Sequence, residues 1–317
     1  MTESRRRILF VAPNPSIDRF HEVERIEVGE IHRPDLALAV PGGKGLNAAR
    51  AAANLGGSVT AVAAIGGDAG AWIRHRLAEL GIDARFVDVP GETRTCLSVL
   101  DRSTGTLTEF YEAGPVVPAG ALDDLLAAVR AVLAAGDVDA VAMSGSLLAG
   151  MPPDGYARLV ALASERGATT ILDTHGEALR VALDARPTVV KVNANEAGEA
   201  TGAPVTDVPS AAAVAETLVV LGAGAVVVTL GAAGAVAHDV TGSWHLSSSE
   251  PAGRYPVGSG DAFLGGLAVG LTAGDTLIDA ARLGMAAGIG NAGMPGAGEL
   301  DRAAVERLRP LIRIEPL

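Results

Sequence analysis

Residues 138–173, VDAVAMSGSLLAGMPPDGYARLVALASERGATTILD, decide the fold class of this chain. The runs at 138–144 and 169–173 are short and apolar, which predicts two buried strands. The residues between them, 152–167, carry apolar side chains at helical spacing and predict a helix. A buried strand, a helix and a second buried strand form the unit from which parallel sheets are built, so this stretch predicts a layered α/β fold.

The same alternation extends over most of the chain. Further buried strands are predicted at 8–12, 59–65, 188–192 and 225–230, and further helices at 46–54, 71–80 and 121–135. The stretch 218–237 has twenty residues without a charge, but glycines interrupt it, so it predicts a helix end, a turn and a strand rather than a membrane span. We therefore expect a three-layer α/β/α sandwich around a mostly parallel sheet, with residues 1–317 in one domain.

Two segments do not follow this alternation. Residues 19–40 alternate polar and apolar side chains about the turn Val28-Gly29-Glu30, and residues 94–112 do so about Ser103-Thr104-Gly105. Such alternation is typical of antiparallel hairpins with one exposed face. We expect the two hairpins to form a small sheet inserted in the domain, either as a lid over a site or as an edge that pairs with a second subunit.

Composition excludes several classes of partner. The formal net charge is −12 and the isoelectric point about 4.9, whereas duplex nucleic acid is bound by a basic face. One cysteine, Cys96, excludes an internal disulfide and fits a reducing compartment. The first apolar run is too short for a secretory signal. We expect a cytoplasmic protein that acts on small molecules, with no nucleic-acid or membrane partner.

Three well-known motifs are missing from the sequence. It contains no G-x-x-x-x-G-K-[ST], which excludes a Walker-type phosphate loop, and no H-E-x-x-H or cysteine cluster that would suggest zinc. The segment GSGDAF at 258–263 fails the dinucleotide-binding pattern, because Phe263 stands where the third glycine belongs. These absences argue against common nucleotide and metal sites.

The stretch VGSGDAFLGGLAVGL, residues 257–271, carries the strongest chemical signal. Gly258, Ser259 and Gly260 can direct consecutive backbone N–H groups at one anion, and Asp261 begins the helix that follows. Asp261 could equally serve only as a helix cap, and the field of the helix is expected to keep it ionised and weakly basic. Phosphoryl transfer to an alcohol needs such a pair, because the carboxylate takes the proton while the amides hold the phosphoryl oxygens.

Other polar residues follow predicted strands or open predicted helices, where ligands collect in α/β sheets. The turn PGGKG begins a helix, and Lys44 and Asn47 would add a cation and an amide to its N-terminus, unless the lysine is only solvated. Asp18, just past the first strand, could hold sugar hydroxyls or serve an ordinary turn. Arg33 and Arg94, in the two hairpin regions, are either surface charges or forks for a phosphate.

Taken together and in order, the motifs resemble those of the ribokinase-like (PfkB-type) carbohydrate kinases, and within them the branch of 1-phosphofructokinase and tagatose-6-phosphate kinase. The resemblance covers almost the whole chain, and the motifs that carry it are NPSID, GEIHR, GGKGLN, TRT, TEFYEAGP, SGSLLAG, LDTHGEAL, KVNANE, VTLGAAG, VGSGDAF and AAGIGNAGMPGAG. It implies a ribokinase-like fold in which the two hairpins are lid strands, use of ATP and Mg²⁺, and a homodimer through the lid strands.

The resemblance also implies roles for individual residues. Asp261 would be the catalytic base, and Gly258, Ser259 and Gly260 would form the anion hole. The residues that bind the sugar phosphate would be Asp18, Arg33, Gly42, Gly43, Lys44, Asn47, Arg94 and Ser144. The residues that bind ATP would be Lys191, Asn193, Glu196, Thr229, Gly231, Gly234 and Asn291, with Glu196 also holding Mg²⁺ through water.

The expected reaction is ATP-dependent phosphorylation of a ketohexose monophosphate, with fructose 1-phosphate first and tagatose 6-phosphate and fructose 6-phosphate as alternatives. Leu148, His175, Val192, Ser259 and Cys96 depart from the family's usual residues, and they leave the reaction type intact but the sugar open. Two other classes remain as alternatives: a non-catalytic sugar-phosphate sensor on the same fold, and a dinucleotide-binding oxidoreductase. An intact Gly-x-Gly-Asp turn argues against the sensor, which would need no base.

Overall fold

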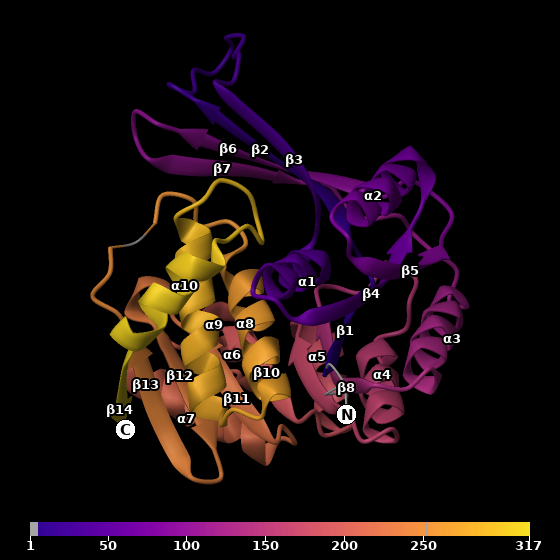
Figure 1. Ribbon diagram of the computed structural model, residues 1–317, viewed down its shortest axis with the longest axis vertical. Helices are drawn as coiled ribbons and strands as arrows, with labels where there is room; N and C mark the ends of the chain where they lie inside the picture. Colours follow the sequence, from indigo (N-terminus) through magenta and orange to yellow (C-terminus); the bar gives the residue numbers. More distant parts are fainter. Residues whose placement is uncertain (1–5, 252) are drawn as a thin grey trace.

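The computed structural model describes residues 6–251 and 253–317 of the chain. Its strands form two sheets of unequal size. Figure 1 shows the larger sheet inside the main body of the molecule and the smaller one projecting from the top of that body.

The larger sheet has ten strands, and seven neighbouring ones are parallel. In spatial order the strands are β14 (Arg313–Pro316), β13 (Gly242–Ser247), β12 (Ala235–Asp239), β11 (Ala225–Thr229), β10 (Val189–Asn193), β9 (Thr169–Asp173), β8 (Val138–Ser144), β1 (Arg7–Ala12), β4 (Ser58–Ile65) and β5 (Asp83–Asp88). At one edge of the sheet, β12, β13 and β14 each pair antiparallel with the neighbouring strand. Because the chain leaves β1 first toward β4 and later toward β8, the order reverses between β1 and β8.

Helices cover both faces of this sheet, which gives three layers. Each face of the sheet packs against a buried apolar cluster. Along β1, Ile8 and Phe10 belong to the cluster on one face, and Leu9 and Val11 belong to the cluster on the opposite face. The first layer contains α1 (Lys44–Asn54), α2 (Gly67–Glu79), α8 (Ser259–Ala273), α9 (Leu277–Ala292) and α10 (Arg302–Leu308). The second layer contains α3 (Ala121–Ala134), α4 (Gly155–Ser164), α5 (Gly176–Leu183), α6 (Ala194–Thr201) and α7 (Val208–Val220). Short 3₁₀ turns, η1 (Gly231–Ala233) and η2 (Arg309–Leu311), complete the elements.

The smaller sheet contains the two hairpins predicted from the sequence. Its strands, in spatial order, are β3 (Leu36–Gly42), β2 (Ser16–Val23), β6 (Arg94–Asp101) and β7 (Thr106–Tyr111). Each hairpin is antiparallel, as predicted, while β2 and β6 join the two hairpins by parallel pairing. The turns lie at the predicted residues, near Gly29 and Gly105. This small sheet has the place expected of the lid.

The predicted α/β/α architecture is confirmed. All six predicted core strands are present, and the segment 218–237 divides into the end of α7, β11, η1 and the start of β12. The sequence did not predict β5 or the antiparallel edge, whose strands are short and half-exposed. No helix within the described residues is both long and apolar enough to span a membrane.

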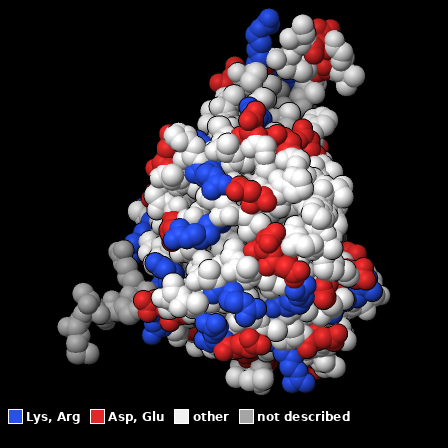
Figure 2. All heavy atoms as spheres, turned by 90° about the vertical axis from the view of Figure 1, so that its right-hand side faces the viewer, with Lys and Arg blue, Asp and Glu red and all other residues white. Residues whose placement is uncertain are grey.

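Acidic and basic side chains are mixed over the face shown in Figure 2, which includes the side of the molecule near α2, α3 and α4. Blue and red spheres lie next to one another there. Ion pairs occur on these elements, such as Arg74 of α2 with Asp88 of β5, and Arg158 of α4 with Asp123 of α3. The excess negative charge of the chain is therefore not gathered into one patch on this face.

Candidate active site

The parallel strands end together at the edge of the sheet below the lid. Ser144 ends β8, Asp173 ends β9, Asn193 ends β10 and Thr229 ends β11. Ligands of open α/β sheets bind outside the carboxyl ends of the strands, where the strand order reverses. The fold thus brings most of the candidate residues to the place where such a sheet binds ligands.

A cleft of about 480 Å³ lies beside these strand ends. Polar groups line one part of it, and the apolar side chains of Phe263, Met285 and Ile289 line another. The candidate residues that line it are Lys44, Lys191, Asn193, Thr229, Gly231, Gly234, Ser259, Gly260 and Asp261. An apolar wall with a few convergent polar groups is typical of a small-molecule site.

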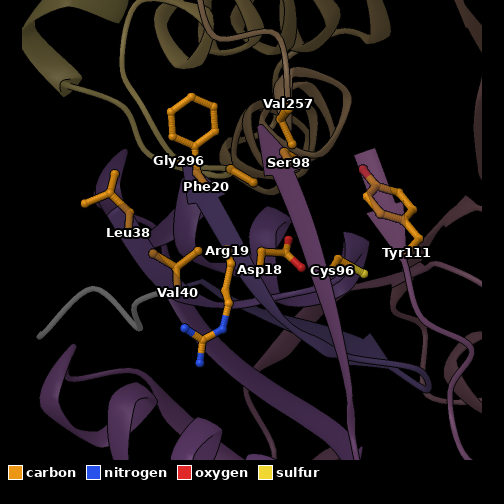
Figure 3. A pocket seen from close by; sticks show the side chains of 11 residues that line it. Asp18, Arg19, Phe20, Leu38, Val40, Cys96, Ser98, Tyr111, Val257 and Gly296 are labelled. Carbon is orange, nitrogen blue, oxygen red and sulfur yellow. The ribbon is translucent and has the colours of Figure 1, made fainter. Parts of the chain in front are cut away.

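A second, much smaller cavity of about 20 Å³ lies under the lid (Figure 3). Asp18 lies on β2 between its register neighbours Val40 on β3 and Cys96 on β6. Val257 and Gly296 close the cavity from the other side, so the lid meets the loops around α8 and α9 here. Phe20, Leu38, Ser98 and Tyr111 also line the cavity, together with Arg19 and Ala297.

The start of α8 carries Asp261 into the region between the two cavities. Gly258 caps the helix at a φ of 80°, a left-handed conformation that glycine adopts without strain. A Cβ at Gly258 would lie 2.6 Å from the Cα of Ala297, so the turn packs directly on that loop. Asp261 itself is 9% exposed, and its Oδ2 accepts a 3.0 Å hydrogen bond from Nδ2 of Asn47.

The protonation of Asp261 differs from the expectation based on the helix alone. Burial, and to a smaller extent the charge of Asp173, raise the pKa of this carboxyl to about 7 against the opposing effects of Lys44, Asn47 and Lys191. The prediction of a fully ionised, weakly basic carboxylate is therefore wrong. The helix field extends over one turn, whereas the loss of water around the carboxyl is nearly complete.

Asp18 is held by a set of short contacts at the root of the lid. Its carboxylate accepts hydrogen bonds from Ser16 Oγ at 2.5 Å, from Asn47 Nδ2 at 2.9 Å and from the backbone N–H of Gly43 at 3.2 Å. A Cβ at Gly42 would lie 2.1 Å from its carboxyl carbon. Asn47 therefore connects Asp18, which lines the lid cavity, with Asp261, which lines the large cleft.

Two lysines meet at a carboxylate that was not among the predicted site residues. Asp173 is fully buried, and it accepts hydrogen bonds from Lys44 Nζ at 3.1 Å and from Lys191 Nζ at 2.8 Å. Burial alone would raise the pKa of Asp173, but the two lysines lower it below its ordinary value. The signal for Asp173 in the sequence is its place at the end of a predicted strand, within LDTHGEAL, which also fits an ordinary turn.

Asn193 and Glu196 form the capping box of α6. The side chain of Asn193 accepts from the N–H of Glu196 at 2.9 Å, and Glu196 Oε2 accepts from the N–H of Asn193 at 2.9 Å. The other oxygen of Glu196 accepts from Lys44 Nζ at 2.7 Å. Burial opposes the charge of Lys44, yet Asp173 and Glu196 hold its pKa above the ordinary value. Lys44 thus belongs to the large cleft and does not line the lid cavity.

Asn14 follows β1, Ser144 ends the neighbouring strand β8, and Arg94 begins the lid strand β6. Arg94 donates from Nη2 to the backbone oxygen of Asn14 at 3.1 Å. Within residues 6–251 and 253–317, Arg94 Nε, Ser144 Oγ and Asn14 Oδ1 are buried polar atoms without a hydrogen-bond partner. Buried polar groups are nearly always paired, so three such atoms in one region indicate a place where a polar ligand binds.

Arg33 and Asn291 are among the candidate residues that line neither cavity. Arg33 is exposed in the loop between β2 and β3, beyond the ends of the paired lid strands. Asn291 is fully buried on α9: its Nδ2 donates to the backbone oxygen of Val257 at 2.8 Å, and its Oδ1 accepts from the N–H of Gly298 at 2.8 Å. Asn291 joins Val257, just before the turn at 258–260, to the loop at Gly298, and it does not line the large cleft.

Comparison with known proteins gives a consistent result. Residues 14–302 match the pfkB family of carbohydrate kinases. A crystal structure of phosphofructokinase-2 from Escherichia coli is similar at 27% identity and a TM-score of 0.85, over 96% of this chain and 98% of that chain. A possible 1-phosphofructokinase from Thermotoga maritima is similar at 25% identity and a TM-score of 0.89, over 98% and 99%. A ribokinase from Arabidopsis thaliana, at 22% identity and a TM-score of 0.73 over 95% and 98%, shares the fold.

Proposed function

The chain belongs to the pfkB family of carbohydrate kinases, which are ATP-dependent phosphotransferases, and we propose that its acceptor is a ketohexose monophosphate, fructose 1-phosphate before fructose 6-phosphate and tagatose 6-phosphate. The observation that carries this proposal is the position of Asp261. Its carboxyl lines the large cleft, and Asn47 joins it to Asp18 in the lid cavity.

A carboxyl with a pKa of about 7 suits a general base at neutral pH, because a useful share is ionised and the ionised form is basic enough to take a proton. In the proposed step an Asp261 oxygen accepts the proton of the acceptor hydroxyl as its oxygen bonds to the transferred phosphorus. The bond from that phosphorus to the leaving oxygen of ADP breaks at the same time. The N–H groups of Gly258 and Gly260 and the Lys44 ammonium hold the phosphoryl oxygens. The N–H of Ser259, which the sequence placed in the same set, instead donates to the backbone oxygen of Pro256 at 3.1 Å.

The large cleft fits ATP in size and lining. Its volume of about 480 Å³ lies within the range of nucleotide-sized pockets, roughly 300–1,000 Å³. We assign the adenine and ribose to the apolar part near Met285 and Ile289, and the phosphates to the part that contains Lys191, Asn193 and Thr229. Asn291 then contributes indirectly, by fixing the turn at Val257.

The described residues fit a magnesium ion held largely by phosphates and water. No group of three or more His, Cys, Asp or Glu side chains arranged for a metal occurs in that part of the chain. Mg²⁺ commonly uses one or two carboxylates, substrate phosphates and several waters. Both oxygens of Glu196 already accept hydrogen bonds, which leaves contact through water. Bound there, the ion would neutralise charge on the phosphates.

The cationic and unpaired polar groups near the lid support an acceptor that already carries a phosphate. Arg94 Nε and Ser144 Oγ are buried without partners, and Asp18 is positioned to accept from sugar hydroxyls. The phosphofructokinase-2 of E. coli has been crystallised with fructose-6-phosphate, which supports a phosphorylated ketohexose as the acceptor class.

The test is ADP release from Mg-ATP with a panel of acceptors: fructose 1-phosphate, tagatose 6-phosphate, fructose 6-phosphate, fructose, ribose and adenosine. Turnover confined to phosphorylated ketoses supports the proposal and names the sugar. Turnover only with unphosphorylated acceptors would contradict the phosphate assignment but retain Asp261 as the base. Binding of a sugar phosphate without any ADP release would favour the sensor.

Arg94 gives a sharper form of this test. Arg94→Gln should raise KM for the phosphorylated sugar by about ten- to a hundredfold, because one charged hydrogen-bonding partner is lost, and leave KM for ATP unchanged. Arg85→Gln is the matched control, since Arg85 is exposed on β5 and paired only locally with Asp83. Equal effects of the two substitutions on KM would contradict a phosphate contact by Arg94.

We also propose a homodimer through the lid. Phe110 and Tyr111 on the edge strand β7 are each 60% exposed, and Ile31 in the lid loop is 82% exposed. Exposed apolar side chains on an unpaired edge favour association. In such a dimer, Arg33 of one subunit could reach only the substrate that is bound in the other subunit. Light scattering should give twice the chain mass, and Phe110→Glu should give a monomer; a monomeric wild-type protein would contradict the dimer.

A further inference from the structure

Arg50 is a charged side chain in the interior beneath the proposed site. It lies on α1, is 2% exposed, and pairs with Glu299 in the loop after α9. Its Nη1 also donates to the backbone oxygen of Ala297 at 2.8 Å and to that of Pro41 at 3.2 Å. The guanidinium therefore ties α1 to the loop 296–299 and to the end of lid strand β3.

The same nitrogen reaches Asn47, one turn earlier on α1. Arg50 Nη1 donates to Asn47 Oδ1 at 3.3 Å, while Asn47 Nδ2 donates to Asp18 and to Asp261. A side-chain amide has one acceptor end and one donor end. With a cation at its oxygen, Asn47 must present its NH₂ group to the two carboxylates.

The backbone of the loop 296–299 packs on the same residues. A Cβ at Gly298 would lie 2.6 Å from the backbone oxygen of Asn47, and Ala297 packs on Gly258. Glu299 keeps 34% of its side chain exposed, so it can remain hydrated if its partner is removed. The loop that receives Arg50 is thus in contact with both the support of the base and the anion-hole turn.

We infer that Arg50, held by Glu299, is a positioning residue that fixes the orientation of Asn47 and thereby the place of Asp261 in the reaction. The expected effect on kcat rests on the proposed function. The expected effect on the orientation of Asn47 rests on geometry alone. A buried ion pair adds little to stability compared with well-packed apolar side chains. A purely structural role would be seen in Arg50→Met as a loss of stability, without a change in the pH profile or in the side-chain amide of Asn47.

The kinetic test uses Arg50→Met, which has similar length and no donors, and Arg50→Lys, which keeps the charge but not the fork. We expect kcat to fall by about ten- to a hundredfold in Arg50→Met, as is usual when a supporting partner of a catalytic group is lost. Arg50→Lys should recover part of this loss, and KM for ATP should not change. Wild-type kcat in Arg50→Met would overturn the inference.

The pH profile separates positioning from loss of stability. The charged groups that face Asp261 are Lys44, Asp173 and Lys191, with Asp18 reached through Asn47. None of these groups is altered in Arg50→Met, so a loosened Asn47 should move the acid limb of kcat/KM to higher pH by weakening the hydrogen bond to the carboxylate. Leu125→Ala, a buried substitution in α3 on the opposite face of the sheet, should lower stability and leave this limb in place.

A double substitution tests whether Arg50 acts through Asn47. In the Asn47→Ala background, Arg50→Met should cost less than twofold in kcat, since its target is gone. Full additivity of the two losses would overturn the inference. If Arg50→Met does not fold, Arg50→Lys in both backgrounds gives the same comparison.

A readout without substrate keeps this result separate from the proposed function. In protein labelled with ¹⁵N-asparagine, the side-chain amide signal of Asn47 is identified by its loss in Asn47→Ala. We expect Arg50→Met to shift that signal and Leu125→Ala to leave it unchanged. An unshifted signal would overturn the positioning of Asn47, whatever the activity. Absence of kinase turnover in the wild-type protein would instead contradict the proposed function.

Discussion

Asp173 and Asp261 are two buried carboxylates whose pKa values are shifted in opposite directions. Asp173, at the end of β9, is fully buried between the ammonium groups of Lys44 and Lys191, and its pKa is lowered. Asp261, at the start of α8, is also buried, but its hydrogen-bond donor is the neutral amide of Asn47, and its pKa is raised to about 7.

The difference teaches that burial alone does not set the role of a carboxylate. Both groups lose water, which raises the pKa of each. Two cations in direct contact outweigh that loss at Asp173 and make it a fixed negative charge. A neutral donor does not outweigh it at Asp261, which remains able to exchange a proton near neutral pH. One carboxylate positions cations, and the other can act as a base.

The largest effect should come from removing the exchangeable carboxylate. Asp261→Asn keeps the shape of the side chain but cannot accept the proton, so kcat should fall by about 10²–10⁴-fold, the usual contribution of a general base. ATP binding should remain close to that of the wild type, since the cleft is unchanged. Steady-state kinetics with a nucleotide-binding measurement check this, and wild-type turnover would contradict the assigned base.

Removing the fixed carboxylate should mainly lower stability. Asp173→Asn leaves Lys44 and Lys191 without their shared partner, and breaking a buried ion pair costs about 3–5 kcal/mol of unfolding free energy. Because the pKa of Asp173 is lowered in the folded state, its contribution exists above pH 4 and is lost as the pH falls. Denaturant unfolding should therefore show a large deficit from pH 8 down to about pH 4, and this deficit should shrink only as the pH falls further below 4.

Asp261→Asn should raise the free energy of unfolding, whereas Asp173→Asn should lower it. A carboxyl with a raised pKa in the folded state destabilises the protein as the pH rises from about 4 through about 7. The asparagine variant has no such loss, so its unfolding free energy at pH 8 should exceed that of the wild type by about 2–4 kcal/mol. The gain should shrink at pH 4. Equal destabilisation by the two substitutions would remove the contrast between the two carboxylates.

The smallest effect is a shift in the pH profile. The wild-type kcat/KM should rise with pH through about 7, as Asp261 loses its proton. The negative charge of Asp173 raises the pKa of Asp261, so Asp173→Asn should move this limb to lower pH. Measurement at a low temperature, where the variant stays folded, checks the direction. A shift to higher pH would show that the two carboxylates do not interact as described.

The layered fold was predictable because its signals are local. Each core strand is a short apolar run, several of these runs alternate with helical patterns, as at 138–173, and each lid hairpin alternates about a glycine turn. The antiparallel edge was not predictable in this way. Strands such as β13 and β14 are half-exposed, and pairing with their neighbours, not their own pattern, makes them strands.

The site was predictable where a residue stands at the end of a predicted strand or the start of a predicted helix, as for Lys44, Lys191 and Asp261. The partners of these residues were not predictable, because they come from distant segments. That Asp173 meets both lysines depends on the order of β8, β9 and β10 in the sheet. The raised pKa of Asp261 depends likewise on three-dimensional burial, which a helix-start pattern does not contain.

The pairing of Arg50 with Glu299 also bears on how the chain is made. The two residues are 249 positions apart, and Asn47 and Asp261 are 214 positions apart. A protein is synthesised from its N-terminus, and contacts between distant segments form slowly. During translation α1 emerges with a guanidinium that has no counter-ion until almost the whole chain has left the ribosome. The proposed site needs Asn47 and Asp261 together, so it can assemble only near the end of synthesis, and a truncated chain released early would lack it.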